Sequence, residues 1–414
     1  MTTSGDRPTV LIIGAGLYVC GRGTDGYGTV LPTLVQAQRD GEIGEIWVAA
    51  VHPESIQGLR RKLDGLNALM GTQATVRCFP HDGVVDPQSY QKALAQLRAP
   101  ACAIVVVPDH LHASVAAEVI RSGVHLLMVK PLAPTLADAH QLMGLLDTHQ
   151  VYGAVDFHKR FDEANLLLRR TLAEGRLGEL RHITVEFSQR ATIRSSFQSW
   201  LPHTNIFQYL GVHYVDLISF LTGARPVRVM ATGQPQAAVR DGLWRLDAIQ
   251  AVVEWVDATS GHSFVSTILT NWIDPDRSPA MSTQRITVVG TQGRYESDQT
   301  YRGVRLVTEQ GGLEELNPYF SQVYPLATGE RVAEGYGPRS IRQFLSDVRD
   351  LVAGNRRVSE LRTCRPSFQE ALVSTAVIEA VAQSLVDGEQ WVSIEEPGPR
   401  VSAIRGRTRE GART

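Results

Sequence analysis

Short apolar runs alternate with helix-forming segments over the first part of the chain. The runs cover residues 9–13, 45–51, 103–107, 124–129 and 151–157. Most of them are β-branched or almost entirely apolar, as in strands that are buried on both faces of a parallel sheet. Strands that alternate with helices in this way predict a doubly wound parallel sheet, whose ligands bind at the carboxyl ends of the strands.

From residue 180 onward the hydrophobic pattern has a period of two. Ile183, Val185 and Phe187 alternate with polar residues, which is typical of a half-buried strand. Five further strands are predicted at residues 227–232, 248–256, 263–271, 285–289 and 304–308, and GTQGRY predicts a turn before another. Strands at this spacing indicate an open antiparallel sheet. A last helix, at residues 367–385, carries apolar residues at helical spacing and is expected to pack in the core.

Residues 204–223 predict one amphipathic helix with an unusual polar face. At about 100° per residue, Asn205, Tyr209, His213 and Asp216 share one narrow arc, and apolar residues fill the opposite arc. A solvated face usually carries Lys, Glu and Arg, so this set of side chains indicates a site. The alternative is a helix whose His and Tyr find partners at a domain interface.

Length and composition narrow the class of protein. A chain of 414 residues predicts two domains. A net charge of −2, with the charges evenly spread, argues against nucleic acid and anionic membranes as partners. The four cysteines form no CxxC pair, which argues against a disulfide framework and a zinc site. No apolar run approaches the ~20 residues that span a bilayer, and no secretion signal opens the chain, so we expect a soluble, cytoplasmic protein.

The first apolar run ends in Gly14-Ala15-Gly16, the opening of a turn that cradles a pyrophosphate. A third glycine would fall at Val19, but the chain continues as a longer glycine-rich segment that carries Arg22. Backbone N–H groups and one guanidinium suit phosphates. The alternative is a mobile surface loop.

The second predicted strand ends without the carboxylate that usually binds the adenosine ribose. Val51-His52-Pro53 stands there, and Arg60, Arg61 and Lys62 follow a few residues later. These cations suit a ribose 2′-phosphate, but they also suit a solvated helix face. The choice between NAD and NADP therefore stays open.

Polar residues also follow the apolar runs at 103–107 and 124–129. Pro108, Asp109, His110 and His112 come after the first, and Lys130 comes directly after the second. The two histidines have no third ligand at useful spacing, so no metal site is predicted. A partly desolvated Lys130 could hold a substrate oxygen or the nicotinamide ribose. The alternative is a lysine that points to solvent.

Five segments follow one another in a set order: GAG after the first strand, VVVPDHLHASVAAEVIRSGVHLLMVKP, FHKRF, LAEGRLGELRHITV and GVHYVDLISFLTG. Together they resemble the Gfo/Idh/MocA family of nicotinamide-dependent sugar and cyclitol dehydrogenases. The resemblance implies an α/β Rossmann domain at residues 1–155 and an α+β domain with a large open, mostly antiparallel sheet at residues 156–395. In the family, a helix such as 367–385 packs back on the Rossmann domain. Residues 396–414 are expected to form a flexible tail.

The resemblance also assigns catalytic roles. Lys130 matches the lysine of the family's EKP motif, His213 matches the acid/base histidine, and Asp216 matches the aspartate three residues later. Val129 replaces the glutamate of EKP, and Tyr209 replaces an aspartate one turn before the histidine. Tyr209 could donate a hydrogen bond or carry a proton, provided that a neighbouring cation such as Lys130 lowers its pKa.

The remaining site residues surround the cleft that the family has between its two domains. The expected contacts of the cofactor, NAD or NADP, are Gly14, Gly16, Leu17, Tyr18, Arg22, His52, Pro108, Asp109, His112 and Lys130. The expected substrate contacts are His158, Arg160, Asn205 and Trp272. For His158 and Arg160 the alternative is an interdomain ion-pair cluster with Asp156 and Asp162.

These observations predict an NAD(P)-dependent oxidoreductase that acts on a secondary alcohol or ketone of a sugar, sugar derivative or cyclitol. Lys130 would hold the alcohol oxygen, and His213 would take its proton. One alternative is redox-neutral elimination of a glycosidic bond, and another is a dinucleotide-binding sensor without turnover. The expected partners are a small polyol or sugar and further copies of the chain, in a homodimer or homotetramer formed through the C-terminal sheet.

Overall fold

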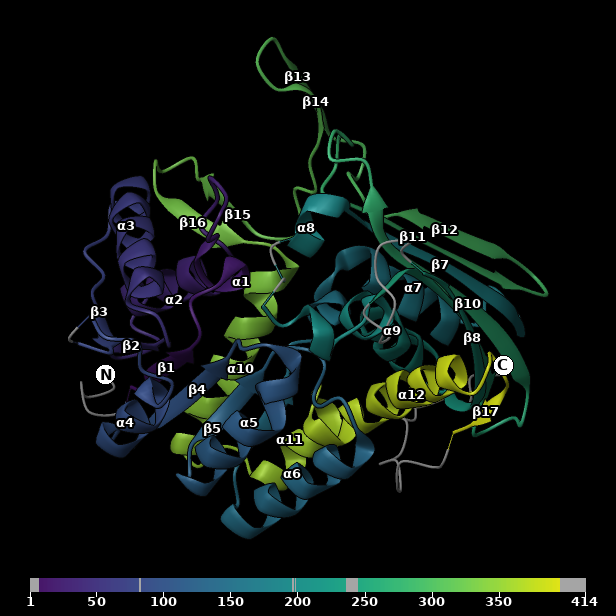
Figure 1. Ribbon diagram of the computed structural model, residues 1–414, viewed down its shortest axis with the longest axis horizontal. Coiled ribbons are helices and arrows are strands. Elements are labelled where there is room, and N and C mark those ends of the chain that lie inside the picture. Colours follow the sequence, from purple (N-terminus) through teal and green to yellow (C-terminus); the bar gives the residue numbers. More distant parts are fainter. Residues whose placement is uncertain (1–6, 82, 196, 198, 236–244, 395–414) are drawn as a thin grey trace, which may run out of the picture.

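Two β-sheets organise the chain. The structure, a computed structural model, describes residues 7–81, 83–195, 197, 199–235 and 245–394. A six-stranded sheet is formed by the N-terminal part of the chain, and a seven-stranded sheet is formed mainly by residues 180–298. Figure 1 shows the first sheet and its helices on the left and the second sheet on the right.

The first sheet is parallel throughout. Its strands are β1 (Thr9–Ile13), β2 (Ile46–Ala49), β3 (Val76–Phe79), β4 (Ala101–Val105), β5 (His125–Met128) and β6 (Gly153–Val155), in the order β3-β2-β1-β4-β5-β6. The helices that connect or flank them are α1 (Leu17–Cys20), α2 (Val30–Arg39), α3 (Pro53–Met70), α4 (Ser89–Gln96), η2 (Asp109–Leu111), α5 (His112–Arg121) and α6 (Leu136–His149). Leu11 belongs to the core on one face of this sheet and Ile12 to the core on the other. The predicted doubly wound parallel sheet is confirmed.

The first helix of the Rossmann fold is interrupted here. Between α1 and α2 the chain makes a loop, residues 21–29, whose base is narrowed by Gly21 and Gly28. Both have positive φ, and a Cβ on either would lie within 3 Å of backbone atoms. Only glycine fits such a close approach.

The second sheet is mixed but mostly antiparallel, as predicted. It contains β7 (Leu180–Arg190), β8 (Arg225–Pro235), β9 (Leu246–Val256), β10 (Ser263–Asp274), β11 (Ser282–Gly290), β12 (Arg294–Asp298) and β17 (Val392–Ser393), in the order β12-β11-β7-β10-β9-β8-β17. Only β7 and β10 pair in parallel among the described strands of this sheet. Because side chains alternate along a strand, Val185 and Phe187 are buried on the inner face, whereas His182 is exposed on the outer face.

Helices cover the inner face of this sheet and join it to the Rossmann domain. They are η3 (His158–Phe161), α7 (Glu163–Ala173), α8 (Ala191–Ser195), η4 (Leu201–His203), η5 (Phe207–Gly211), α9 (Val212–Thr222) and α12 (Phe368–Val386). Helix α12 packs on β8 and α9 and also contacts α6 and β6 of the first sheet. In Figure 1 it extends from the first sheet toward the second.

After the large sheet, the chain returns to the Rossmann domain a second time. It does so through a hairpin and two helices that were not predicted from the sequence. The hairpin of β15 (Gln322–Pro325) and β16 (Arg331–Glu334) precedes α10 (Tyr336–Val352) and α11 (Val358–Cys364). Ile341, Phe344 and Val348 of α10 are buried in the same core as Ile12. The chain therefore contributes to the Rossmann core after it has completed the large sheet.

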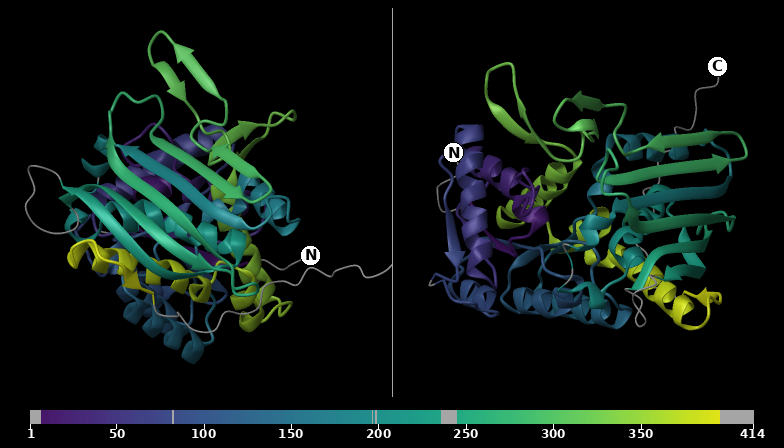
Figure 2. Two further views of the ribbon diagram at one scale, coloured as in Figure 1. Left: turned by 90° about the vertical axis from the view of Figure 1, so that its right-hand side faces the viewer. Right: turned by 45° about the horizontal axis from the view of Figure 1, so that its top comes forward.

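Two element predictions need correction. The strand predicted at 304–308 is β13 (Arg305–Thr308), which pairs with β14 (Gly312–Glu315) in a separate hairpin rather than in the large sheet. Figure 2 shows this hairpin projecting from the body of the molecule. The helix predicted at 204–223 is also not one regular α-helix, because it opens with the π-helical turn η5 before α9 begins.

The tail predicted at residues 396–414 lies outside the described residues. Within the described part of the chain, every helix is too short or too polar to cross a bilayer.

Candidate active site

The glycine turn after β1 leaves room for a phosphate. At Gly14, where φ is +116°, a Cβ would lie 2.0 Å from the carbonyl oxygen of Val106, at the end of the neighbouring strand. At Gly16 a Cβ would meet none of the described atoms within 4 Å. Gly14 therefore permits close packing, and Gly16 leaves open space beside the start of α1, where Leu17 is the first residue. Backbone amides next to open space suit a pyrophosphate.

Tyr18 ties this turn to the rest of the molecule. Its hydroxyl donates to Oδ2 of Asp156 at 2.5 Å, and the hydroxyl of Ser340 donates to Oδ1 at 2.6 Å. Burial raises the pKa of both Asp156 and Tyr18. The network joins the glycine turn to the end of β6 and the start of α10, so the hydroxyl of Tyr18 holds the turn in place.

Lys130 lies just beyond the end of β5 and reaches toward η5. Its Nζ donates to the carbonyl oxygen of Tyr209 at 2.5 Å and lies 3.9 Å from the centroid of that ring. Burial lowers the pKa of Lys130 to about 8, against the opposite effect of Asp109 and Asp156. The ammonium is therefore mostly protonated at pH 7. It has three N–H donors, so the bond to Tyr209 leaves donors for a ligand.

His213 lies in the first turn of α9 and is 6% exposed. Within the described residues, its Nδ1 has no hydrogen-bond partner. Such unpartnered buried atoms are rare and call for an explanation, which a ligand would supply. Burial lowers the pKa of His213 well below its usual value, and Lys130, His158 and Lys159 lower it further. The imidazole is therefore neutral at pH 7 and can accept a proton.

His158 completes the group. Its ring centroid lies 4.9 Å from that of His213, 5.2 Å from Phe320 and 5.7 Å from Tyr336. Burial lowers its pKa, and so do Lys159 and Lys130. Four predicted site residues, Lys130, His158, Tyr209 and His213, thus meet where β5, η3, η5 and α9 converge.

Arg160, expected to contact substrate or to belong to an ion-pair cluster, forms a salt bridge with Asp216, which was expected to orient its helix or bind a hydroxyl. Nε and Nη2 of Arg160 donate to the two carboxylate oxygens of Asp216 at 2.9 and 2.6 Å, and Glu370 lies 3.6 Å from Nη1. Both members of the pair are buried. Their charges are satisfied by each other, so neither is free for substrate. The pair fixes η3 against α9, behind His213.

Asp109 and His112 brace the site from inside the protein, although both were expected to contact the cofactor. Oδ2 of Asp109 accepts from Thr204 Oγ1 and from Gln208 Nε2, each at 2.9 Å. His112 is fully buried, with its ring nitrogens 2.6 Å from the carbonyl oxygen of Pro131 and 3.0 Å from that of Val107. Pro108 directly precedes Asp109 and η2.

Asn205 and Trp272, which were expected to contact substrate, are both buried. Oδ1 of Asn205 accepts from the backbone N–H of Gln208 at 2.9 Å and so caps the π turn. Trp272 exposes none of its surface, because its position on β10 points it toward the inner helices. The guanidinium of Arg194 lies 5.8 Å from its ring.

Tyr209 does not have the lowered pKa that proton transfer would need. Burial raises the pKa of its phenol, Asp109 raises it further, and only Gln189 lowers it. The expected lowering by Lys130 is therefore absent. The ring of Tyr209 packs on Phe197 and Trp200, and the ammonium of Lys130 lies over its face in a cation–π contact.

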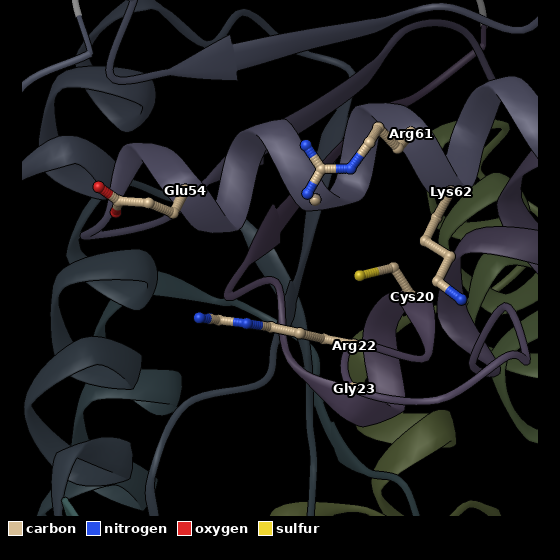
Figure 3. A pocket seen from close by; sticks show the side chains of 7 residues that line it. Cys20, Arg22, Gly23, Glu54, Arg61 and Lys62 are labelled. Atoms are coloured by element: carbon tan, nitrogen blue, oxygen red, sulfur yellow. The ribbon is translucent and has the colours of Figure 1, made fainter.

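Arg22 and His52 lie on the adenosine side of the fold. Nη1 of Arg22 donates to the hydroxyl of Ser55 in the first turn of α3 at 2.7 Å. His52 is exposed and directly precedes α3. Figure 3 shows Arg22 extending along one side of a cavity, with α3 on the other side.

Lys159 is the residue that the sequence did not assign. It is 3% exposed, and its Nζ donates to Oε1 of Gln284 at 2.5 Å. Burial lowers its pKa to about 7. In the sequence, the only feature that indicated Lys159 was its position between His158 and Arg160. Its hydrogen-bond partner Gln284 lies 125 residues away on β11, so no local pattern indicates the contact.

Comparisons with known proteins agree with this fold. Residues 44–157 match the family model described as "Oxidoreductase family, NAD-binding Rossmann fold", and residues 166–296 match the "GFO/IDH/MocA C-terminal domain". Inositol 2-dehydrogenase of Rhizobium meliloti is 21% identical over 69% of this chain and 79% of its own length. The uncharacterized oxidoreductase YhhX of Escherichia coli is 31% identical over 32% of this chain, a match that spans only 39% of YhhX.

The fold also matches a solved structure of scyllo-inositol dehydrogenase from Lactobacillus casei with bound NAD(H) and scyllo-inositol. The TM-score is 0.62 at 16% identity, over 94% of this chain and 99% of that one. Two adjacent family models, one for each sheet, together with the agreement in fold, lead to one conclusion: the chain belongs to the Gfo/Idh/MocA family of NAD-binding oxidoreductases.

Proposed function

We propose that the protein is a dehydrogenase that interconverts a secondary alcohol and a ketone on a sugar, sugar derivative or cyclitol. The observation that carries the proposal is the meeting of a protonated Lys130 with a neutral His213 whose Nδ1 has no partner among the described residues. Support for a polyhydroxylated substrate comes from a relative named inositol 2-dehydrogenase and from a structural neighbour with scyllo-inositol bound.

The residues present fit a nicotinamide dinucleotide. Gly14 and Gly16 would let the pyrophosphate approach the backbone, and Tyr18 would hold the turn in place. When bound, the nicotinamide supplies a hydride acceptor for oxidation or a hydride donor for reduction.

Lys130 and His213 would divide the proton chemistry between them. The ammonium of Lys130 would donate a hydrogen bond to the alcohol oxygen and stabilise the negative charge that develops on it. Nδ1 of His213 would accept the hydroxyl proton during oxidation and return it during reduction. Because the pKa of His213 is depressed, the base is available at neutral pH.

A spectrophotometric screen tests the proposal. Purified protein is incubated with a panel of sugars and cyclitols, with NAD and NADP in parallel, and reduced nicotinamide is followed by its absorbance. We expect steady reduction with at least one polyol. Redox-neutral turnover with a tightly held, non-exchanging dinucleotide would contradict net dehydrogenation, and so would dinucleotide binding without any turnover.

A further inference from the structure

A cavity on the Rossmann domain lies beside the glycine turn, outside the group of Lys130 and His213. Its volume is about 510 Å³, and its walls are Cys20 at the end of α1, Arg22 and Gly23 of the loop, and Glu54, Gly58, Arg61 and Lys62 of α3. Figure 3 shows Arg22 and Arg61 on facing walls, with Glu54 at one end and Lys62 at the other. Three cations therefore face one carboxylate.

The position of this cavity relates it to the dinucleotide. Cys20 lies four residues after Gly16, and Ser55, which accepts from Arg22, lies in the first turn of α3, directly after β2. In this fold the adenosine ribose binds at the carboxyl end of β2, and an arginine there accommodates a 2′-phosphate. The cavity thus begins between the places of the pyrophosphate and of the ribose.

The charges are arranged so that two of them stay available. Lys62 is committed to the loop, because its Nζ donates to the carbonyl oxygens of Thr24 at 2.5 Å and of Gly26 at 2.8 Å. Arg22 uses one Nη for Ser55 and keeps its other N–H donors. Arg61 forms no ion pair within the described part of the chain.

The described residues at the end of β2 include no carboxylate that could accept hydrogen bonds from a ribose diol. The strand ends in Ala49, and Ala50, Val51 and His52 follow before α3. Asp86 comes close, since its N–H donates to the carbonyl oxygen of Val51, but its carboxylate pairs with Lys92 at 2.8 Å. Among the described residues that line the cavity, Glu54 is the carboxylate that could accept from ribose hydroxyls, and it would repel a phosphate.

We infer that this cavity binds the 2′-phosphate of NADP, held between the guanidinium groups of Arg22 and Arg61, and that the protein prefers NADP to NAD. The inference concerns dinucleotide binding alone and is independent of the polyol substrate. Guanidinium groups recognise phosphates through charge-assisted, bidentate hydrogen bonds. The loop between α1 and α2 would then serve to place Arg22 beside α3, where it hydrogen-bonds to Ser55.

Binding measurements without substrate test this inference. We expect the Kd for NADPH, from quenching of protein fluorescence, to be at least roughly tenfold lower than that for NADH, as the loss of charge-assisted hydrogen bonds would imply. The fragment 2′,5′-ADP should compete with NADPH, whereas 5′-AMP and inorganic phosphate should compete weakly. Strong competition by inorganic phosphate alone would reveal a general anion site and overturn the inference.

Three variants sharpen the test. Arg61→Ala should raise the Kd for NADPH roughly tenfold and leave that for NADH within about twofold. Arg121→Ala, an exposed arginine on α5, is the matched control and should change neither. Glu54→Gln should lower the Kd for NADPH by removing repulsion. If Glu54→Gln raises the Kd for NADPH, or if Arg61→Ala weakens both dinucleotides equally, the cavity does not hold the 2′-phosphate and the inference is wrong.

Discussion

His213 and Lys130 belong to one group of buried or half-buried side chains and have opposite proton states. Burial favours the uncharged form of both, yet the usual pKa of lysine is so high that its ammonium survives the shift, whereas the imidazole loses its proton. A positively charged hydrogen-bond donor, Lys130, and a neutral proton acceptor, His213, are thus available together at pH 7. Hydride transfer from an alcohol needs this combination.

Removal of the imidazole should stop proton transfer without disturbing dinucleotide binding. We expect His213→Ala to lower kcat by roughly 100-fold or more, the usual size of an acid/base contribution. Steady-state kinetics and dinucleotide titration measure the two effects separately. His149→Ala, an exposed histidine at the end of α6, is the control and should behave like the wild type. Normal turnover in the His213 variant would contradict the assignment.

Lys130 should set an alkaline limit to alcohol oxidation. Its pKa is lowered to about 8, so the charge that stabilises the alkoxide is present below that pH and lost above it. We expect kcat/KM to fall as pH rises through about 8. In Lys130→Arg the guanidinium stays protonated, so the remaining activity should lose this alkaline limb. An unchanged limb in the arginine variant would assign the titration to another group.

The sequence indicated Lys130 and His213 as candidate residues, but it did not indicate which side chains pair with one another around them. Lys130 and His213 could be placed because each follows from local pattern and family motif. Arg160 and Asp216 belong to the same motifs, but that they pair with each other depends on how η3 packs on α9. The partner of Lys159 lies on β11, and no local pattern reveals a contact across such a separation.

At the scale of elements, the buried salt bridge between Arg160 and Asp216 joins η3 to α9, the helix that carries His213. We expect Asp216→Asn to lower the free energy of unfolding by about 3–5 kcal/mol, because the charge of Arg160 would stay buried without its main partner. Urea denaturation measures this loss.

The double variant Arg160→Met, Asp216→Leu separates charge from packing. It removes both charges and fills a similar volume, so it should recover much of the lost stability. If the double variant is as unstable as the single one, the pair contributes through its geometry rather than by charge compensation.

Most elements were predictable because their periodicity is local. The strands of both sheets alternate or run apolar as buried strands do, and all but one of the predicted strands joins the sheet expected of it. The exception is β13, whose sequence resembles that of a sheet strand although it pairs, among the described strands, with β14 alone. The π turn η5 was missed because a helical wheel assumes a constant 3.6 residues per turn.

At the scale of the whole molecule, the large sheet has one covered face and one open face. Helices pack on the inner face, while Met230, Val252 and Val265 on the outer face stay partly or fully exposed in the single chain. The left view of Figure 2 looks onto this sheet with the helices behind it. The same face also carries the salt bridges Arg228–Glu254 and Arg285–Glu186, so it mixes apolar and charged side chains, and such a mixed open face suits association between copies of the chain.

We expect light scattering to show a homodimer or homotetramer. Val252→Glu, at the centre of the outer face, should dissociate the assembly by placing a charge in the interface. The same change at Val307, 74% exposed on the hairpin β13–β14, is the matched control. A monomeric wild type, or dissociation by the hairpin variant alone, would exclude the sheet as the interface.

The π turn at Phe207–Gly211 has a consequence for how such a site can change. A π turn contains one residue more than an α-helical turn, and it absorbs the rotation of about 100° that an extra residue would otherwise impose on everything after it. The segment before α9 can therefore gain or lose one residue at this turn while His213 and Asp216 keep their directions. A residue inserted within α9 itself has no such turn to absorb it, and would move the residues after it to another side of the helix.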